Sequence, residues 1–284
     1  MSEVESAPDT HGQSPSGAEK LRLGGMALRN GLLVHGPTHW AAACRRPGAP
    51  IAVASGPKPR ARATERIPAL RGVVRMGEAM AVVPLARRAL PDARLPFEDR
   101  RVLGAMVVAG VAGQLLRRRA GRTGSGRGRT GTEAVVAAIS VLPSLIALRD
   151  GDLAAYHGAE HKAIAAYEQD AEDASETAKE HDRCGSHLLT PLLASNLVGG
   201  ALLRAAVRRP GPVHHALVGL GSVGIAVEVF AWAERHHDSA AARALRVPGH
   251  ELQRALGTRE PTEAQLEVAR AALSEILRVE GQQA

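Results

Sequence analysis

Hydrophobic and polar positions divide the chain into distinct blocks. Residues 1–20 are mostly small, polar or acidic, and they predict a disordered tail. In residues 21–55, short apolar runs are broken by glycine and proline, which is typical of a small β-rich unit. Apolar residues at helical spacing then predict a helix over residues 66–90. We therefore expect residues 21–100 to form an N-terminal unit of strands and helix on the cytoplasmic side.

Four long apolar blocks follow this unit. They are Val102–Leu116, Ala134–Leu148, Leu188–Val207 and Val213–Ala233. A membrane-spanning helix usually needs about twenty apolar residues. The first two blocks are shorter than that, so their flanking arginines would have to reach the membrane surface. An Arg/Gly-rich connector separates these two blocks within residues 101–149, and the other pair occupies residues 188–233.

Two architectures fit the blocks. By hydropathy alone, buried helices of a soluble α-helical protein and a membrane bundle are about equally supported. Glycines such as Gly110, Gly199 and Gly224 recur within the blocks, and small residues let membrane helices pack closely. The balance favours a mainly α-helical multi-pass membrane protein with a small N-terminal β-rich unit and a C-terminal amphipathic helix. Gly24-Gly25, by contrast, we interpret as a turn.

Residues 234–284 predict a soluble C-terminal segment. Thr262 and Gln265 resemble a capping box at the start of a helix. The apolar stripe at helical spacing that follows consists of Leu266, Ala269, Leu273, Ile276 and Leu277. We interpret this amphipathic helix as packing material.

Composition and charge indicate which kinds of molecule the chain binds. The net charge of +7 comes mainly from arginines, several of which flank the apolar blocks. The run Arg117–Arg129 lacks the interleaved aromatic side chains on which nucleic-acid bases stack, so we expect lipid headgroup contact and no nucleic acid. The lipid bilayer is thus the expected partner. Cys44 and Cys184 are the only cysteines, which fits a reducing compartment.

The chemistry concentrates in residues 150–187, where the pattern H-x-x-E-H occurs. On a helix, His157 and His161 would lie four residues apart on one face and could hold one divalent metal ion. Glu160 would lie beside them as a general base that takes a proton from a water molecule. Glu168 would share the stripe of His157 but lie too far from His161 to bind the same ion.

A third ligand is needed for a catalytic zinc site. The acidic segment after the helix is long enough to fold back, and either His181 or Cys184 would then complete the set. Zinc is the divalent metal that His and Cys ligands favour. Two alternatives remain: the motif can arise by chance, with histidines that are ordinary surface or core residues, and Cys184 can be a small buried hydrophobe.

These residues also carry a resemblance to a known family. The central motif is Tyr156-His157-Gly158-Ala159-Glu160-His161-Lys162, followed by Ala166-Tyr167-Glu168 and His181-x-Arg183-Cys184-Gly185. Further matches are Gly24-Gly25, Gly31, Gly36-Pro37, Leu70-Arg71-Gly72, Leu252-Gln253, Thr258-Arg259-Glu260-Pro261 and Gln265-Leu266-Glu267-Val268-Ala269. Over residues 22–280 the chain resembles the bacterial YqhQ-like family, domain of unknown function 1385. The departures from the family pattern are Met26, Asn30 and His35, where Gln, Glu and Arg are usual.

The resemblance implies a multi-pass protein of the bacterial cell membrane and a metal-dependent enzyme with no assigned reaction. An even number of spans would place both termini and residues 150–187 on one side. The reduced Cys184 and the lack of a visible export signal favour the cytoplasm, although Arg117–Arg129 on the far side would break the positive-inside tendency. Two functions remain open: a zinc hydrolase of unknown substrate, or a non-catalytic membrane scaffold or assembly factor with a structural metal or polar site.

Overall fold

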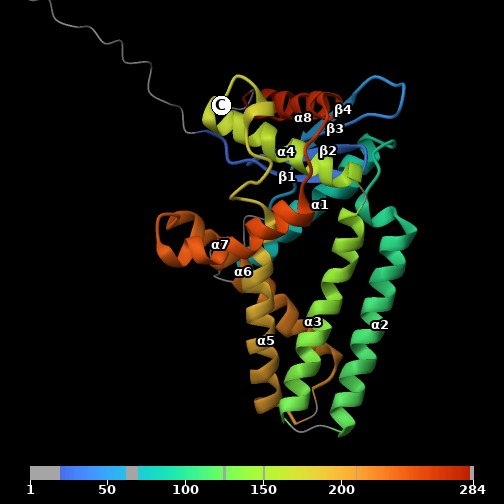
Figure 1. The fold of residues 1–284 in the computed structure, drawn as a ribbon, viewed down its shortest axis with the longest axis vertical. Coiled ribbons are helices and arrows are strands. Elements are labelled where there is room, and N and C mark those ends of the chain that lie inside the picture. Colours follow the sequence, from blue (N-terminus) through green and yellow to red (C-terminus); the bar gives the residue numbers. More distant parts are fainter. Residues whose placement is uncertain (1–19, 62–69, 124–125, 150, 209, 282–284) are drawn as a thin grey trace, which may run out of the picture.

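The computed structural model describes residues 20–61, 70–123, 126–149, 151–208 and 210–281. The predicted tail thus lies outside the described residues, apart from Lys20. Figure 1 shows two parts, which we call the head and the bundle. The head contains a β-sheet with the helices that cover its faces, and the bundle contains four long helices.

The sheet of the head is antiparallel and joins strands that are consecutive in the chain. Its order is β1-β2-β3-β4. The strands are β1 (Gly24–Leu28), β2 (Gly31–His35), β3 (His39–Cys44) and β4 (Ala52–Pro57). The small β-rich unit is therefore confirmed. The interpretation of Gly24-Gly25 as a turn was wrong, because both residues pair with β2 and the tight connection lies at residues 29–30.

Helices cover both faces of the sheet, as the period-two alternation of strand side chains requires. Leu32 and Val34 point to one face and pack against helices α4 (Gly151–Gln169) and α8 (Glu263–Gly281). Leu33 and Trp40 point to the opposite face and pack against α1 (Leu70–Ala89). Full burial of such a side chain contributes about 1.5–3 kcal/mol. The first of these hydrophobic layers holds α4 against the sheet.

The bundle extends from the head as two pairs of helices (Figure 1). They are α2 (Arg100–Thr123), α3 (Gly126–Leu148), α5 (Leu189–Ala206) and α6 (Pro212–Arg235). Helices α2 and α3 continue well into the Arg/Gly-rich segment, further than the apolar blocks suggested. Beyond α6, helix α7 (Ala240–Leu252) projects sideways where head and bundle meet.

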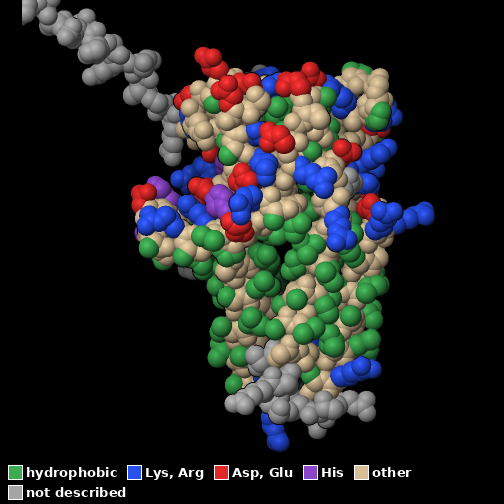
Figure 2. All heavy atoms as spheres, in the orientation of Figure 1, with side chains coloured by type: hydrophobic (Ala, Val, Ile, Leu, Met, Phe, Trp, Pro, Cys, Tyr) green, Lys and Arg blue, Asp and Glu red, His purple; other side chains and the backbone are tan. Residues whose placement is uncertain are grey.

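The surface of the bundle is strongly apolar. Figure 2 shows hydrophobic side chains over the visible face of the bundle, whereas charged side chains gather over the head. Val108 of α2, Leu202 of α5 and Leu217 of α6 are 66%, 65% and 63% exposed. Contiguous exposed apolar surface of this size marks a region that contacts lipid or protein. In the described chain, the apolar blocks are therefore not the buried helices that the soluble alternative requires.

Three segments of the described chain are long and apolar enough to cross a membrane. They are Gly131–Leu148, Gly185–Ala206 and Pro212–Arg235. Helix α2 is not among them, because arginines at both of its ends shorten its apolar stretch. Of the four expected spans, three thus meet the requirements of length and composition, and α2 packs beside α3 as the fourth helix of the bundle.

Candidate metal centre

Helix α4 carries the H-x-x-E-H motif through the interior of the head. Its residues from Leu153 to Ala166 are buried, except for the half-buried His157. Such burial needs close approach of neighbouring backbone, and Gly158 provides it. A Cβ atom at this position would overlap the carbonyl oxygen of Arg259, whose N–H donates to the Ala154 carbonyl at 2.9 Å. Helix α4 is therefore clamped against the chain just before α8.

Three potential ligand atoms converge at this helix. One atom each from His157, His161 and Cys184 lies within 4.8 Å of the other two. The Sγ atom of Cys184 is 3.4 Å from Nε2 of His157, and the two imidazole rings are 4.4 Å apart between centroids. Zinc–ligand distances of about 2.0–2.3 Å place pairs of ligands about this far apart. The acidic segment folds back far enough to bring Cys184 to both histidines.

Backbone carbonyls orient both imidazole rings. Nδ1 of His157 is 2.8 Å from the carbonyl oxygen of Gly257, and Nδ1 of His161 is 2.7 Å from that of Lys179. A carbonyl only accepts hydrogen bonds, so each Nδ1 must carry the hydrogen. Each Nε2 consequently keeps its lone pair, which is the tautomer that a metal ligand requires.

Burial also tunes the charge of the donors. The pKa of His161 is lowered to about 2, chiefly by burial and next by the neighbouring His157. Burial raises the pKa of the Cys184 thiol, although hydrogen bonding with Ser186 lowers it in part. His161 is therefore a neutral imidazole, ready to bind a cation. The thiol of Cys184 would lose its proton when a metal binds.

Glu160 is buried beside the cluster. Only 5% of the residue is exposed, and its Oε2 atom has no hydrogen-bond partner. Burial raises the pKa of its carboxyl group to about 8, while His157 lowers it and Cys184 raises it further. Strand β1 crosses so close that a Cβ atom on Gly25 would overlap the carboxyl group. An unpartnered buried carboxyl is costly and points to a function that uses it.

His181 lies next to the three donors but is bonded elsewhere. Its ring centroid is 5.6 Å from that of His161. The N–H of Arg183 donates to Nδ1 of His181 at 3.2 Å, so Nε2 carries the hydrogen and donates to Glu168 at 3.1 Å. Glu168 also pairs with Arg183. Of the two candidates for a third ligand, Cys184 is the one whose ligand atom joins the histidine pair, and His181 orders the segment that carries Cys184.

A buried glutamine holds the same segment from the other side. Gln253 is fully buried, its Oε1 accepts from the N–H of His181 at 2.8 Å, and its Nε2 donates to Oγ of Ser186 at 2.8 Å. It begins a π-helical turn, Gln253–Gly257, which presents the Gly257 carbonyl to His157. π-Helical turns frequently mark functional sites.

Lys162 fixes the acidic segment after α4. Its ammonium group is buried and donates to the carbonyls of Ser175 at 2.8 Å and Thr177 at 2.7 Å. It also forms an ion pair with Glu260 at 2.8 Å. Thr177 in turn donates to the Lys162 carbonyl at 3.0 Å. This reciprocal bonding holds the segment in which Lys179 accepts from His161.

Sequence reasoning missed several members of this site. Gly25, Lys162 and Gln253 support the donors. All three stand in the motifs that carry the family resemblance, which was the available signal, but Gly25 was assigned to a turn and the other two were given no role. The carbonyls of Lys179 and Gly257 gave no signal, since every residue carries one.

Comparison with known proteins adds a family but no activity. A family model described as "Protein of unknown function (DUF1385)" matches residues 137–279, half of the chain. No curated protein and no solved structure matches the chain. The matched region contains the H-x-x-E-H helix, Cys184 and the π-helical turn, which together build the cluster, and most of α8. The chain therefore belongs to the DUF1385 family of proteins of unknown function.

Proposed function

We propose that this chain is a zinc-dependent hydrolase embedded in the bacterial cell membrane, with its head in the cytoplasm. The observation that supports it most is the cluster in the head. Three donors lie within 4.8 Å of one another, with the partnerless carboxyl of Glu160 beside them. Three protein ligands with a nearby free carboxylate are the arrangement of catalytic rather than structural zinc sites.

The donor set fits zinc. His157 and His161 each present an Nε2 lone pair, because their Nδ1 hydrogens are held by carbonyl oxygens. Cys184 adds a sulfur atom, and mixed nitrogen and sulfur ligands favour zinc over magnesium or calcium. Carbonyl groups behind ligating histidines raise their basicity and fix their orientation.

The residues divide the chemistry between them. When bound, zinc would supply Lewis-acid activation of a water molecule and of the substrate carbonyl or phosphoryl group. Glu160 would take the proton of that water and pass it to the leaving group. Burial of Glu160 raises the pKa of its carboxyl group to about 8, which suits a group that both accepts and donates a proton near neutral pH.

The membrane part of the proposal rests on the bundle. Three segments of the described chain have the length and composition of membrane spans, and large apolar side chains on all four helices of the bundle face outward. In this arrangement the head and its cluster lie outside the bilayer, next to the membrane surface.

A structural metal site is the second candidate, and burial favours it. His161 is 2% exposed and Glu160 is 5% exposed, which leaves a substrate little direct access. Glu160 would then be a fourth ligand that closes the site, and the protein would serve as a membrane scaffold or assembly factor. The two candidates differ in one property, an open coordination position.

Metal content tests whether the cluster binds zinc. Full-length protein purified in detergent should contain about one zinc per chain by mass spectrometry. His157→Ala and Cys184→Ser should lose it, whereas His237→Ala, which removes an exposed histidine outside the cluster, should keep it. Wild-type protein without zinc, or zinc retained by both cluster variants, would refute the site.

Cobalt then separates the two candidates. Cobalt-substituted protein should show thiolate absorption, and added azide should change the spectrum only if a coordination position is open. The hydrolase proposal expects an azide effect in both wild type and Glu160→Gln, with metal affinity unchanged by the substitution. If added azide leaves the spectrum unchanged and Glu160→Gln binds metal weakly, Glu160 is a ligand. The scaffold function would then be the one that remains.

A further inference from the structure

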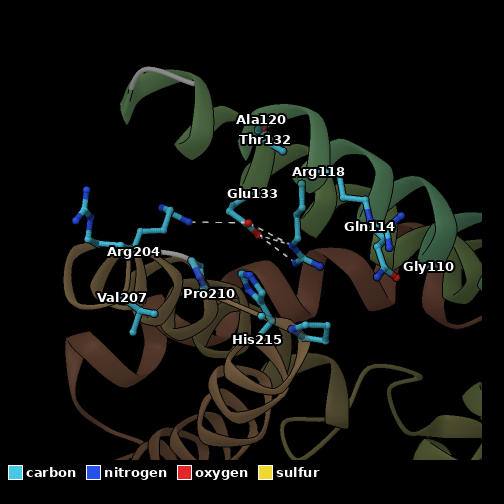
Figure 3. Close-up of a pocket in the computed structure, with 14 residues that line it drawn as sticks. Gly110, Gln114, Arg118, Ala120, Thr132, Glu133, Arg204, Val207, Pro210 and His215 are labelled. Carbon is cyan, nitrogen blue, oxygen red and sulfur yellow. Dashed lines mark hydrogen bonds and ion pairs between the residues drawn. The ribbon is translucent and has the colours of Figure 1, made fainter. Parts of the chain in front are cut away.

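A second polar site lies at the end of the bundle away from the head. A cavity of about 560 Å³ opens there between the pair α2 and α3 and the pair α5 and α6 (Figure 3). Its lining includes four arginines, Arg117, Arg118, Arg204 and Arg208, and one acidic residue, Glu133. Pockets that bind small ligands commonly have volumes of about 300–1,000 Å³.

Glu133 is already committed within this cavity. It holds Arg117 in a two-pronged ion pair, with Nε at 3.2 Å from both carboxylate oxygens and Nη2 at 3.0 Å from one of them. Figure 3 shows Glu133 between Arg204 and the donor atoms of α2. These three contacts use most of the roughly four acceptor sites of the carboxylate.

Arg204 is left incompletely satisfied. Its Nη1 atom is 3.9 Å from Glu133, too long for a hydrogen bond, and it is buried without a hydrogen-bond partner. The side chain as a whole is 18% exposed. A buried guanidinium nitrogen without an acceptor is unfavourable, because it has lost its water and gained nothing in return.

The cavity also has an excess of positive charge. Among the charged residues of the described lining, four arginines face one glutamate. Like charges that are held together at a partly desolvated site repel each other unless an anion joins them. The guanidinium group is a planar fork of donors that matches the oxygens of a phosphate group.

We propose that this cavity binds a phosphate-type oxyanion, with Arg204 as its central donor. The ligand is either the phosphate of a lipid headgroup or free phosphate, which share this chemistry. Leu115 on α2 and Val213 on α6 are exposed apolar residues that directly follow the lining residues Gln114 and Pro212, and they would lie along the chains of a lipid. The site is separate from the metal cluster and does not depend on the proposed hydrolase function.

Titration with inorganic phosphate is the first arm of the test. Full-length protein in an uncharged detergent is titrated in a calorimeter. Removal of one charge-assisted hydrogen bond lowers the affinity for phosphate by about tenfold. Arg204→Gln should weaken binding by at least that factor, and Arg204→Lys should weaken it less. Arg119→Gln is the control, since Arg119 is exposed on α2 next to the lining residues Arg117 and Arg118 but is not itself part of the lining. It should change affinity less than about twofold.

A substitution of opposite sign excludes a purely structural effect. Glu133→Gln removes the negative charge that repels an anion, so phosphate should bind more tightly to it than to wild type. A variant that merely damages the fold would weaken binding in both cases. The zinc contents of all variants should match wild type, because the cluster lies at the other end of the molecule.

Lipid retention is the second arm. Protein reconstituted with equal amounts of phosphatidylglycerol and phosphatidylcholine is extracted in mild detergent, and native mass spectrometry reports the lipid that stays bound. Retention of phosphatidylglycerol by wild type but not by Arg204→Gln, without competition by free phosphate, identifies a headgroup. Binding of inorganic phosphate identifies the free anion. If neither phosphate nor lipid binds in a manner that depends on Arg204, the proposal is wrong.

Discussion

Gly25 of strand β1 lies against the carboxyl group of Glu160 on helix α4, so close that a Cβ atom at position 25 would overlap Oε1. The strand thus forms a wall of the candidate metal centre. The wall lies outside residues 137–279, the region that the family model matches. Strand β1 therefore completes a site whose other residues all follow it in the chain by more than one hundred positions.

Gly25→Ala should disturb this wall. The added methyl group must displace Glu160 or strand β1, and overpacking of a buried site typically costs about 1–3 kcal/mol. Denaturant unfolding in detergent should show that loss, together with weaker zinc binding. Gly77→Ala is the control: Gly77 has open space around its Cβ position within α1, so alanine should be neutral or stabilise by up to about 1 kcal/mol. Equal stability of Gly25→Ala and wild type would contradict the close approach.

Lys162→Met should loosen the segment that follows α4. Methionine keeps an apolar stem of similar length but leaves the carbonyls of Ser175 and Thr177 without their donor, which costs about 2–3 kcal/mol. Hydrogen exchange should rise across residues 174–180, and zinc affinity should fall because Lys179 accepts from His161. Glu260→Gln provides the comparison. Its side chain is 66% exposed, so loss of this ion pair alone should cost less than about 1 kcal/mol.

Glu280 should make stability depend on pH. Burial alone would raise the pKa of its carboxyl group, but hydrogen bonds from Thr38 and from the His39 backbone outweigh burial and lower it. A folded pKa below the unfolded value means that the stabilisation is present above about pH 4–5 and is lost as pH falls through the folded pKa.

Unfolding of wild type and Glu280→Gln between pH 7 and pH 3 measures this effect. At pH 7 the variant should be less stable by about 1–3 kcal/mol, because an amide NH₂ group would face N–H donors. The difference should shrink as the pH falls. Glu172→Gln, at an exposed position, should follow wild type throughout. A constant difference across the pH range would show that Glu280 does not titrate as a stabilising carboxylate.

Leu220→Arg should report whether α6 crosses a membrane. Leu220 is 53% exposed near the middle of the helix. A surface substitution in water usually changes stability by less than about 0.5 kcal/mol. Arginine near the centre of a membrane span instead costs about 2.5–3.5 kcal/mol. The fraction of protein that resists carbonate extraction should fall for Leu220→Arg and stay high for Val247→Arg, which lies on α7. Full carbonate release of wild type would place the bundle outside the membrane.

The hydrophobic pattern was sufficient for the helices of the bundle but not for their ends. Apolar blocks located α3, α5 and α6 because apolar stretches of fifteen residues or more are too long for strands. Helix α2 continues through Arg117–Arg119, which the pattern assigned to a connector, because arginine is a good helix former despite its charge. The Gly24-Gly25 pair shows the opposite error. Glycine was interpreted as a turn residue, whereas position 25 requires it to let a carboxyl group approach.

The candidate site divides along similar lines. His157, His161 and Cys184 could be proposed as metal ligands because His and Cys are the side chains that commonly bind zinc. The choice between Cys184 and His181 could not be made, because it depends on where Glu168 and the Arg183 backbone bind the imidazole of His181. The orienting groups at Lys179 and Gly257 are main-chain carbonyls, and three-dimensional folding alone selects them.

The hydrogen bond between His157 and Gly257 joins residues 100 positions apart, and this has a consequence for biosynthesis. When the ribosome has made α4, the acceptor that selects the tautomer of His157 has not yet been translated. The pair of helices α5 and α6 must be synthesised, and delivered to its final place, before the π-helical turn and α8 can reach the head. The candidate metal centre is thus among the last parts of the molecule to form, and a nascent chain that stops before Gly257 carries both histidines without a finished site.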